Sequence, residues 1–126
     1  MSDWQGQTDE IKALMRTLRG DTPNVMKAFS SLAQAALAPQ ALAPQALDCK
    51  TKELIALAIA VAIRCDDCIG FHVKAALEQG ATRAEVVETL GMAVYMGAGP
   101  SVMYAAHALD AFEQFGKATQ PATTAA

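Results

Sequence analysis

The most reactive pattern in this 126-residue chain is a pair of cysteines separated by two aspartates. Cys65 and Cys68 lie three positions apart, a spacing that lets both thiols face one side of a helical first turn and close a disulfide. Unpaired amides at a helix N-terminus favour the thiolate, which is the nucleophilic form. Asp66 and Asp67 act in the opposite direction, because nearby negative charge disfavours a second anion. The balance predicts a moderately acidic thiol.

A histidine follows the second cysteine at helical spacing. His72 comes four residues after Cys68, so a helix brings its imidazole over the same face as that sulfur. Histidine exchanges protons near neutral pH and can draw the proton from a thiol. The pattern therefore gives Cys68 the attacking role and Cys65 the resolving role. Zinc is the minority alternative, because the chain has no second Cys-x-x-Cys or His-x-x-x-His to complete four ligands.

Three further polar residues are weighed as candidates and expected to be structural. Glu53 borders the apolar run from Leu54 to Ile63, and for an arbitrary helix the solvent-facing end is favoured over burial. His107 is expected to be a packed or exposed residue of the last helix, and Cys49 a loop residue.

The amino-acid composition and net charge indicate which kinds of molecule the chain can bind. Hydrophobic residues make up 52% of the chain and charged residues 18%, against roughly 25% charged in an average soluble domain. Apolar surface is therefore expected to meet another chain. A helix that is apolar on every side over 54–63 must be covered on every side, which a monomer of this size can hardly do, so we expect a homo-oligomer. The net charge of −3, without a Lys/Arg cluster, argues against nucleic acid.

The same apolar run excludes a membrane span, since it is about half of the roughly 20 residues that a bilayer-crossing helix needs. The N-terminus carries Asp3 where a signal peptide would carry basic residues. We therefore expect a cytoplasmic protein, where a close cysteine pair is more often redox-active, catalytic or metal-binding than a permanent staple.

Alanine, leucine and methionine dominate the chain, which predicts an all-α fold in a single domain over residues 1–126. The core is expected at about 48–116 and a disordered tail at 117–126. The tandem Ala-Leu-Ala-Pro-Gln over 36–45 is interpreted as a duplicated surface loop.

Local signals give the helix boundaries. Thr8 is expected to cap the first helix and Thr22-Pro23 to open the second; Gly80 ends the fourth, and Thr82 to Glu85 form a capping box. Together they predict six helices, at about 8–18, 22–38, 48–64, 65–79, 82–97 and 100–115.

Taken together, Glu53, eleven intervening residues and then Cys65-x-x-Cys68-x-x-x-His72 resemble the signature of the alkylhydroperoxidase D-like family, within the carboxymuconolactone decarboxylase superfamily. The likeness runs from about Asp48 to Ala108. It implies an all-α fold that assembles as homo-trimers or hexamers. It also implies a peroxidase or disulfide reductase of antioxidant defence that needs no bound cofactor and no metal.

The resemblance also implies roles for the four residues. Cys68 attacks the peroxide, Cys65 resolves the sulfenic acid as a disulfide, and His72 with Glu53 relays the proton. Electrons come from a lipoyl-bearing or other dithiol donor, and some members reduce a peroxiredoxin. Helix geometry alone leaves Glu53 and His72 offset by several ångströms, so Glu53 is included on resemblance. This chain departs from some active members in carrying Asp67 where they have a second histidine.

Two alternatives remain from other classes. One is a decarboxylase of the ring-cleavage type found elsewhere in the superfamily, which does not require a cysteine pair. The other is a redox- or zinc-sensing interaction module.

Overall fold

The computed structural model describes residues 3–38 and 46–119, and every regular element within those ranges is a helix. This confirms the all-α prediction. The elements in chain order are α1 (Trp4–Asp21), α2 (Pro23–Leu37), α3 (Cys49–Ala62), α4 (Asp66–Glu78) and α5 (Arg83–Thr119). None of the helices in the described ranges is long and apolar enough to cross a membrane.

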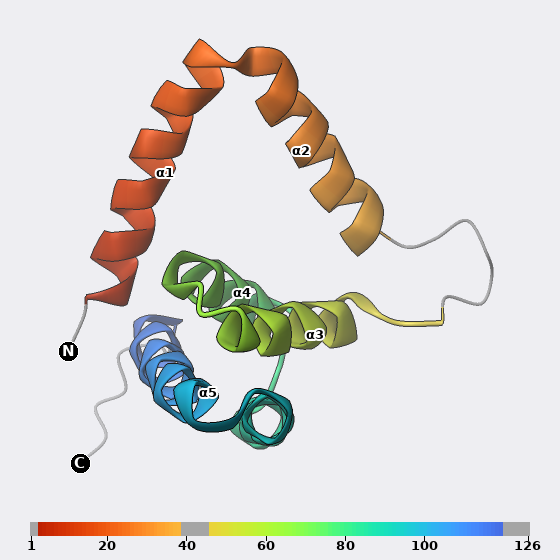
Figure 1. Ribbon diagram of the computed structural model, residues 1–126, viewed down its shortest axis with the longest axis vertical. Coiled ribbons are helices and arrows are strands. Elements are labelled where there is room, and N and C mark those ends of the chain that lie inside the picture. The colour runs from red at the N-terminus through yellow and green to blue at the C-terminus, as the bar shows by residue number, and fades with distance from the viewer. Residues whose placement is uncertain (1–2, 39–45, 120–126) are drawn as a thin grey trace.

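Helices α3, α4 and α5 pack together as the body of the molecule, and α1 and α2 form a V that stands away from it (Figure 1). The fully buried apolar side chains all come from the body: Leu57, Val61, Ile69, Val73 and Val86. The candidate cysteines at the start of α4 are thus carried by the best-packed part of the chain.

The first helix begins earlier than predicted, and its cap is Asp3 instead of Thr8. The Asp3 carboxylate accepts a hydrogen bond from the Gly6 amide at 3.1 Å. Trp4 is buried, and its indole Nε1 donates to Asp110 of α5 at 2.8 Å. Thr8 is buried inside α1, facing Gly70 of α4. A cap and a tertiary anchor at consecutive positions, Asp3 and Trp4, therefore set the start of this helix.

The predicted connection between α4 and α5 is confirmed. Gly80 has a left-handed φ of 85°, and the following Ala81 amide donates to the Ala76 carbonyl at 2.9 Å, which closes the end of α4. The capping box then opens α5: the Thr82 amide donates to Glu85 Oε1 at 2.8 Å and the Glu85 amide to Thr82 Oγ1 at 3.1 Å.

The fifth and sixth predicted helices form one element. Helix α5 runs from Arg83 to Thr119, with a break at Ala98, whose φ of 58° and ψ of −148° are not helical. The break falls where Gly97-Ala98-Gly99 and Pro100 predicted a boundary, but the chain bends there instead of forming a loop. The described residues therefore form five elements, of which α5 consists of two helical arms that meet at the break where the expected fifth and sixth helices adjoin.

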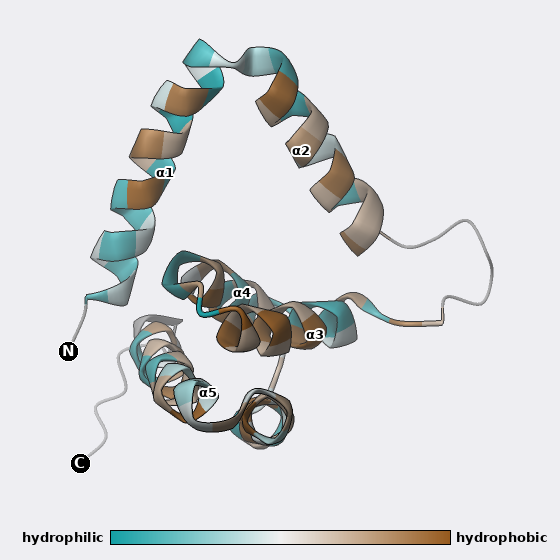
Figure 2. Ribbon diagram, viewed as in Figure 1, coloured by the Kyte–Doolittle hydropathy of each residue, from teal (hydrophilic) through white to brown (hydrophobic). Residues whose placement is uncertain are grey.

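The expected start of the C-terminal tail needs correction. Residues 117–119 belong to α5 and not to a disordered tail, while 120–126, like the repeat residues 39–45, lie outside the described residues. As expected of so apolar a run, a single chain does not cover α3 on every side: Ile55 and Ile59 are exposed, and so is Ile63 just after its end, at 65%. Figure 2 shows hydrophobic residues, in brown, along α3 and on both arms of the V.

An ion pair links the start of α3 to the start of α5. Lys50 Nζ lies 2.8 Å from Glu85 Oε2 at the surface. The hydrogen bond from Lys50 holds the pKa of the Glu85 carboxyl below its usual value, and the same bond raises the pKa of Lys50. At the start of α3 itself, the hydrogen bonds from Thr51 lower the pKa of the capping residue Asp48.

The left-handed residue at the end of α4 gives a direct stability test. Gly80→Ala should lower the free energy of unfolding by about 1 kcal/mol, because a Cβ there meets no neighbouring atom but disfavours the positive φ. The matched control is Gly91→Ala inside α5, which also has open space around it and should raise that free energy by about 0.5 kcal/mol. Urea unfolding followed by circular dichroism measures both, and effects of the same sign would contradict the assignment.

Candidate active site

Cys65 stands at the junction of α3 and α4 and takes part in both helices. Arg64 adopts a left-handed φ of 62°, and the Cys65 amide then donates to the Ala60 carbonyl at 3.0 Å, which closes the end of α3. The Cys65 sulfur in turn accepts a hydrogen bond from the Cys68 amide at 3.2 Å, which caps α4. One residue therefore ends one helix and begins the next.

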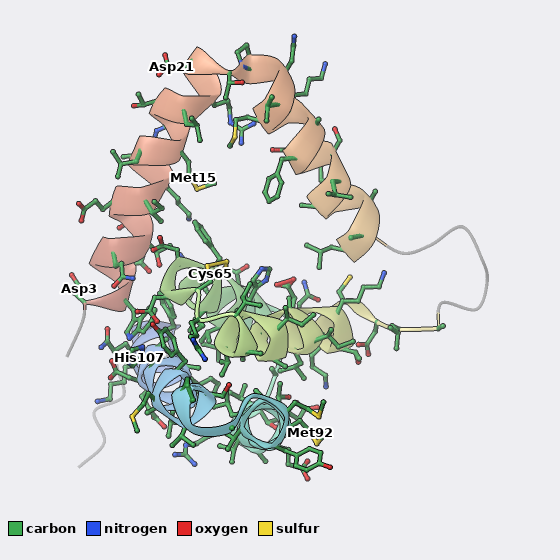
Figure 3. All side chains as sticks on the ribbon, in the orientation of Figure 1. Asp3, Met15, Asp21, Cys65, Met92 and His107 are labelled. Atoms are coloured by element: carbon green, nitrogen blue, oxygen red, sulfur yellow. A yellow bond between two sulfur atoms is a disulfide. The ribbon has the colours of Figure 1, made fainter. Side chains whose placement is uncertain are left out.

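The two cysteines are joined as a disulfide, as their spacing predicts, with Cα atoms 5.2 Å apart. Both are half-buried. Figure 3 shows Cys65 on the side of the body that faces α1 and α2. Cys68 lies within the first turn of α4, where the helix presents its unpaired amides, so a thiolate released by reduction forms at the end of the helix that favours an anion.

Glu53 and His72 are brought together from two different helices. His72 Nδ1 of α4 lies 3.3 Å from Glu53 Oε2 of α3. The offset predicted from helix geometry is therefore closed without a neighbouring subunit. The expectation that Glu53 lies at a solvent-facing end is wrong, since only 5% of the residue is exposed. The apolar residues that follow it carry it into the body.

The second oxygen of that carboxylate lacks a partner. Glu53 Oε1 is buried and has no hydrogen-bond partner among the described residues. Burying a carboxylate is unfavourable unless it is paired, and His72 supplies the pairing at one oxygen. An ionised carboxylate only accepts hydrogen bonds, so the histidine tautomer that pairs with it carries its proton on Nδ1 and leaves Nε2 to exchange one. This imidazole lies on the helix that carries Cys68.

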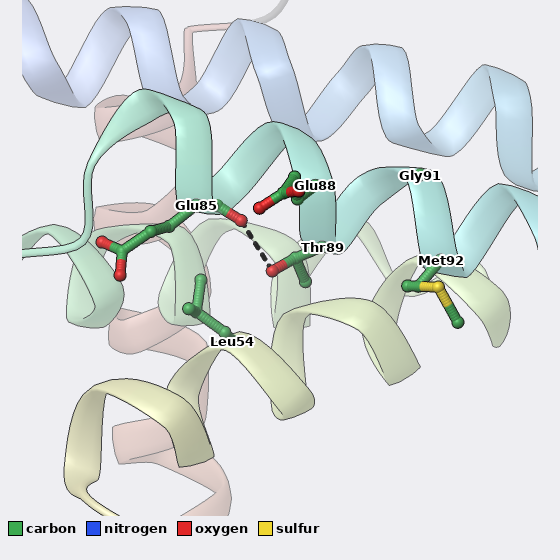
Figure 4. Close-up of a pocket in the computed structure, with 6 residues that line it drawn as sticks. All are labelled: Leu54, Glu85, Glu88, Thr89, Gly91 and Met92. Atoms are coloured by element: carbon green, nitrogen blue, oxygen red, sulfur yellow. Dashed lines mark hydrogen bonds between the residues drawn. The ribbon is translucent and has the colours of Figure 1, made fainter.

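An open groove of about 710 Å³ lies away from these residues, between α3 and α5 (Figure 4). It is lined by Leu54, Glu85, Glu88, Thr89, Gly91 and Met92. Two smaller hollows lie between α1 and α4. One, of about 230 Å³, includes Asp67, the neighbour of Cys68; the other, of about 290 Å³, includes Phe71, the neighbour of His72. The side of α4 that faces α1 therefore offers concave surface next to the candidate site.

A second histidine contact at the start of α4 was not predicted. His107 Nδ1 of α5 lies 2.9 Å from Asp66 Oδ1, and 41 positions separate them in the chain. No spacing rule connects residues so far apart, so sequence patterns could not reveal the pair. Cys49 is the first residue of α3, not a loop residue, and is a free, half-buried thiol.

No group of three or more His, Cys, Asp or Glu side chains in the described part of the chain converges as a metal site would. The disulfide also occupies the two sulfurs that the zinc alternative would use.

A family model described as the carboxymuconolactone decarboxylase family matches residues 23–111, which include Glu53, both cysteines and His72. The chain belongs to this family. Two relatives in it are uncharacterised proteins. One, from Cupriavidus necator, is 39% identical over 112 residues, covering 89% of this chain and 95% of that protein. The other, from Haemophilus influenzae, is 37% identical over 111 residues, covering 88% and 94%.

Solved structures of family members share the fold. An apo structure of a carboxymuconolactone decarboxylase family protein from Legionella pneumophila is 52% identical and superposes with a TM-score of 0.84, covering 91% of this chain and 98% of that one. A family protein from Thermotoga maritima is 27% identical with a TM-score of 0.77, covering 88% and 91%, and is described as having a possible involvement in an antioxidative response.

The pairing of the two sulfurs leads to a thiol-counting prediction. The reduced chain should lose two titratable thiols on mild oxidation, because Cys65 and Cys68 close on each other while Cys49 has no such neighbour. Counting with a chromogenic disulfide reagent, before and after oxidation, measures this. The Cys49→Ser variant is the control and should lose the same two. One equivalent of zinc per chain that protects both thiols would contradict the prediction.

Proposed function

We propose that this family member is a thiol-dependent peroxidase or disulfide reductase of antioxidant defence. The observation that carries the proposal is a disulfide at the N-terminus of α4, on the same helix as a histidine that is paired with a buried glutamate. A dithiol that can open and close, together with an oriented imidazole, is what two-electron reduction of a hydroperoxide requires.

In the proposed reaction the Cys68 thiolate attacks one oxygen of a hydroperoxide and the O–O bond breaks. Cys68 becomes a sulfenic acid, and the alcohol leaves after taking up a proton. The Cys65 thiol then attacks the Cys68 sulfur, the S–S bond forms and water leaves. A dithiol donor, such as a lipoyl group, reduces the disulfide to two thiols and is itself oxidised to a disulfide.

His72 and Glu53 are assigned the proton transfers of this reaction. His72 lies one helical turn after Cys68, so its imidazole can take the thiol proton and give it to the departing alkoxide. Glu53 pairs with Nδ1 and leaves Nε2 for the proton exchange. The same residues would serve disulfide exchange with a protein substrate such as a peroxiredoxin. No bound cofactor is needed, and a cytoplasmic location would supply the reductant.

The cysteine pair is also what favours thiol chemistry over the decarboxylase alternative that the family name suggests. Ring-cleavage decarboxylation has no use for a disulfide.

Assembly is the second part of the proposal: the chain forms a homo-oligomer, a trimer or hexamer by its family resemblance. Ile55, Ile59 and Ile63 form an exposed apolar stripe on α3, and Phe29 and Leu32 of α2 are exposed on the V. Exposed apolar patches of this kind usually mark contact between chains.

The mass in solution should therefore be a multiple of the 13.2 kDa chain. Light scattering after size exclusion at micromolar concentration measures it. Ile59→Lys should shift the population towards smaller species. Glu78→Lys, at another exposed position at the end of α4, should not. A stable monomer in the unmodified protein would refute assembly.

Cys68 is predicted to be the attacking thiol. Cys65→Ser should leave a sulfenic acid on Cys68 that cannot resolve within the chain, and Cys68→Ser should leave a thiol that reacts slowly. His72→Gln should slow the first step by the roughly 10² to 10⁴-fold typical of a lost general base while the fold is kept. Trapping with a dimedone-type reagent and locating the label by mass spectrometry measures the outcome. Label on Cys65 in Cys68→Ser, at the wild-type rate, would reverse the roles.

A further inference from the structure

A second imidazole–carboxylate pair lies at the N-terminal end of α4, in addition to Glu53 and His72. His107 Nδ1 lies 2.9 Å from Asp66 Oδ1, and the Tyr104 ring packs against the His107 ring with centroids 4.9 Å apart. Asp66 is the first residue of α4 and directly follows Cys65. The proposed reaction assigns no step to this pair, although it borders one of the two reacting sulfurs.

The charge on Asp66 bears directly on thiolate formation. The amides at the start of α4 favour an anion on Cys65 or Cys68, but Asp66 and Asp67 bring negative charge to the same turn and oppose it. Asp67 contacts a neutral group instead of an imidazole: its Oδ1 lies 3.5 Å from the side-chain amide of Gln7. Other ionisable side chains on the elements around this turn include Arg64 before α4, His72 and Lys74 along it, Glu53 of α3, His107 of α5, and Glu10 of α1, which lines a hollow together with Asp67.

The chemistry of the contact lets His107 change charge without breaking it. An ionised carboxylate only accepts hydrogen bonds, so Nδ1 carries the proton that points to Asp66. Nε2 is then the atom that gains or loses a proton, and a gain turns the hydrogen bond into an ion pair. A positive imidazole on Asp66 offsets that residue's repulsion of a nearby thiolate. The side chains of His107 and Asp66 are 38% and 40% exposed, so solvent screening keeps the effect moderate.

We propose that His107 is a positioning residue of the thiol site: it holds and neutralises the Asp66 carboxylate and thereby favours the first thiolate formed by the reduced Cys65–Cys68 pair. This inference rests on the proposed thiol chemistry of the pair. It concerns ionisation of the reduced protein, so it can be measured without hydroperoxide or donor.

The test is the pH midpoint of thiolate formation, followed by the ultraviolet absorbance of the thiolate in the fully reduced protein. A Cys49→Ser background removes the third thiol. His107→Gln keeps a side chain that can donate to Asp66 but removes the charge, and it should raise the midpoint by about 0.5 pH unit, as expected for a partly screened unit charge. His107→Lys keeps a positive charge and should restore the midpoint. Asp66→Asn should lower it.

The combination of variants separates this role from a structural one. In the Asp66→Asn background, His107→Gln should leave the midpoint unchanged, because the proposed effect of His107 acts through the Asp66 carboxylate. In the matched control Asp67→Asn, His107→Gln should shift the midpoint as it does without that change.

A histidine that only ties α5 to α4 would lower the unfolding temperature when replaced and leave the midpoint unmoved. That result, or an equal shift in the Asp66→Asn background, overturns the inference. A midpoint that shifts as expected in a protein that turns over no hydroperoxide or disulfide supports the inference and rejects the proposed function, so the two failures are distinguishable.

Discussion

The backbone at Arg64 and Cys65 connects the two helices on which the candidate site depends. With Arg64 in the left-handed region, the Cys65 amide donates to the Ala60 carbonyl and closes the end of α3. Helix α4 begins at the next residue, Asp66. The chain therefore folds back on itself at the point where the cysteines lie. A left-handed conformation is uncommon for a residue other than glycine and is unfavourable by roughly 1 kcal/mol or more. The equivalent turn after α4 uses Gly80, which has no such penalty.

This fold-back also explains why a carboxylate and an imidazole that are 19 positions apart can meet. Glu53 lies roughly 15 Å back along α3 from the junction, and His72 about 10 Å forward along α4, by the rise of an α-helix. The reach of the two side chains closes the remaining offset. Glu53 itself is buried, so little water reaches its carboxylate. The imidazole–carboxylate pair thus includes a polar residue from the edge of an apolar helix.

Local signals predicted much of the fold, and tertiary contacts account for what they missed. Pro23, Asp48, Gly80 and the Thr82–Glu85 capping box each act on the nearest turn of backbone, so their helix boundaries are confirmed. The start of α1 was missed because Asp3 and Thr8 are both good caps, and the burial of Trp4 against α5 decides between them.

The residues of the candidate site also divide into those that local sequence predicts and those that depend on tertiary contacts. The cysteine pair and His72 follow from spacing along one helix, so sequence alone identifies them. Glu53 was placed by resemblance, and the contact between His107 and Asp66 could not be foreseen, since each depends on how separate helices pack. Likewise the glycines and the proline locate the break at Ala98. Whether the chain bends or forms a loop there depends on how the two arms of α5 pack against α3 and α4.

The sequence separation of the Cys65–Cys68 bridge, three residues, has a thermodynamic consequence of its own. A crosslink stabilises a protein largely by reducing the loop-closure entropy of the denatured chain, and in that account a four-residue loop contributes about 2 kcal/mol against nearly 5 kcal/mol for a loop of a hundred residues. Opening this bridge therefore releases little of the chain. The folded chain therefore depends less on this bridge than it would on a crosslink between distant segments, and reduction of the pair is not expected to unfold it.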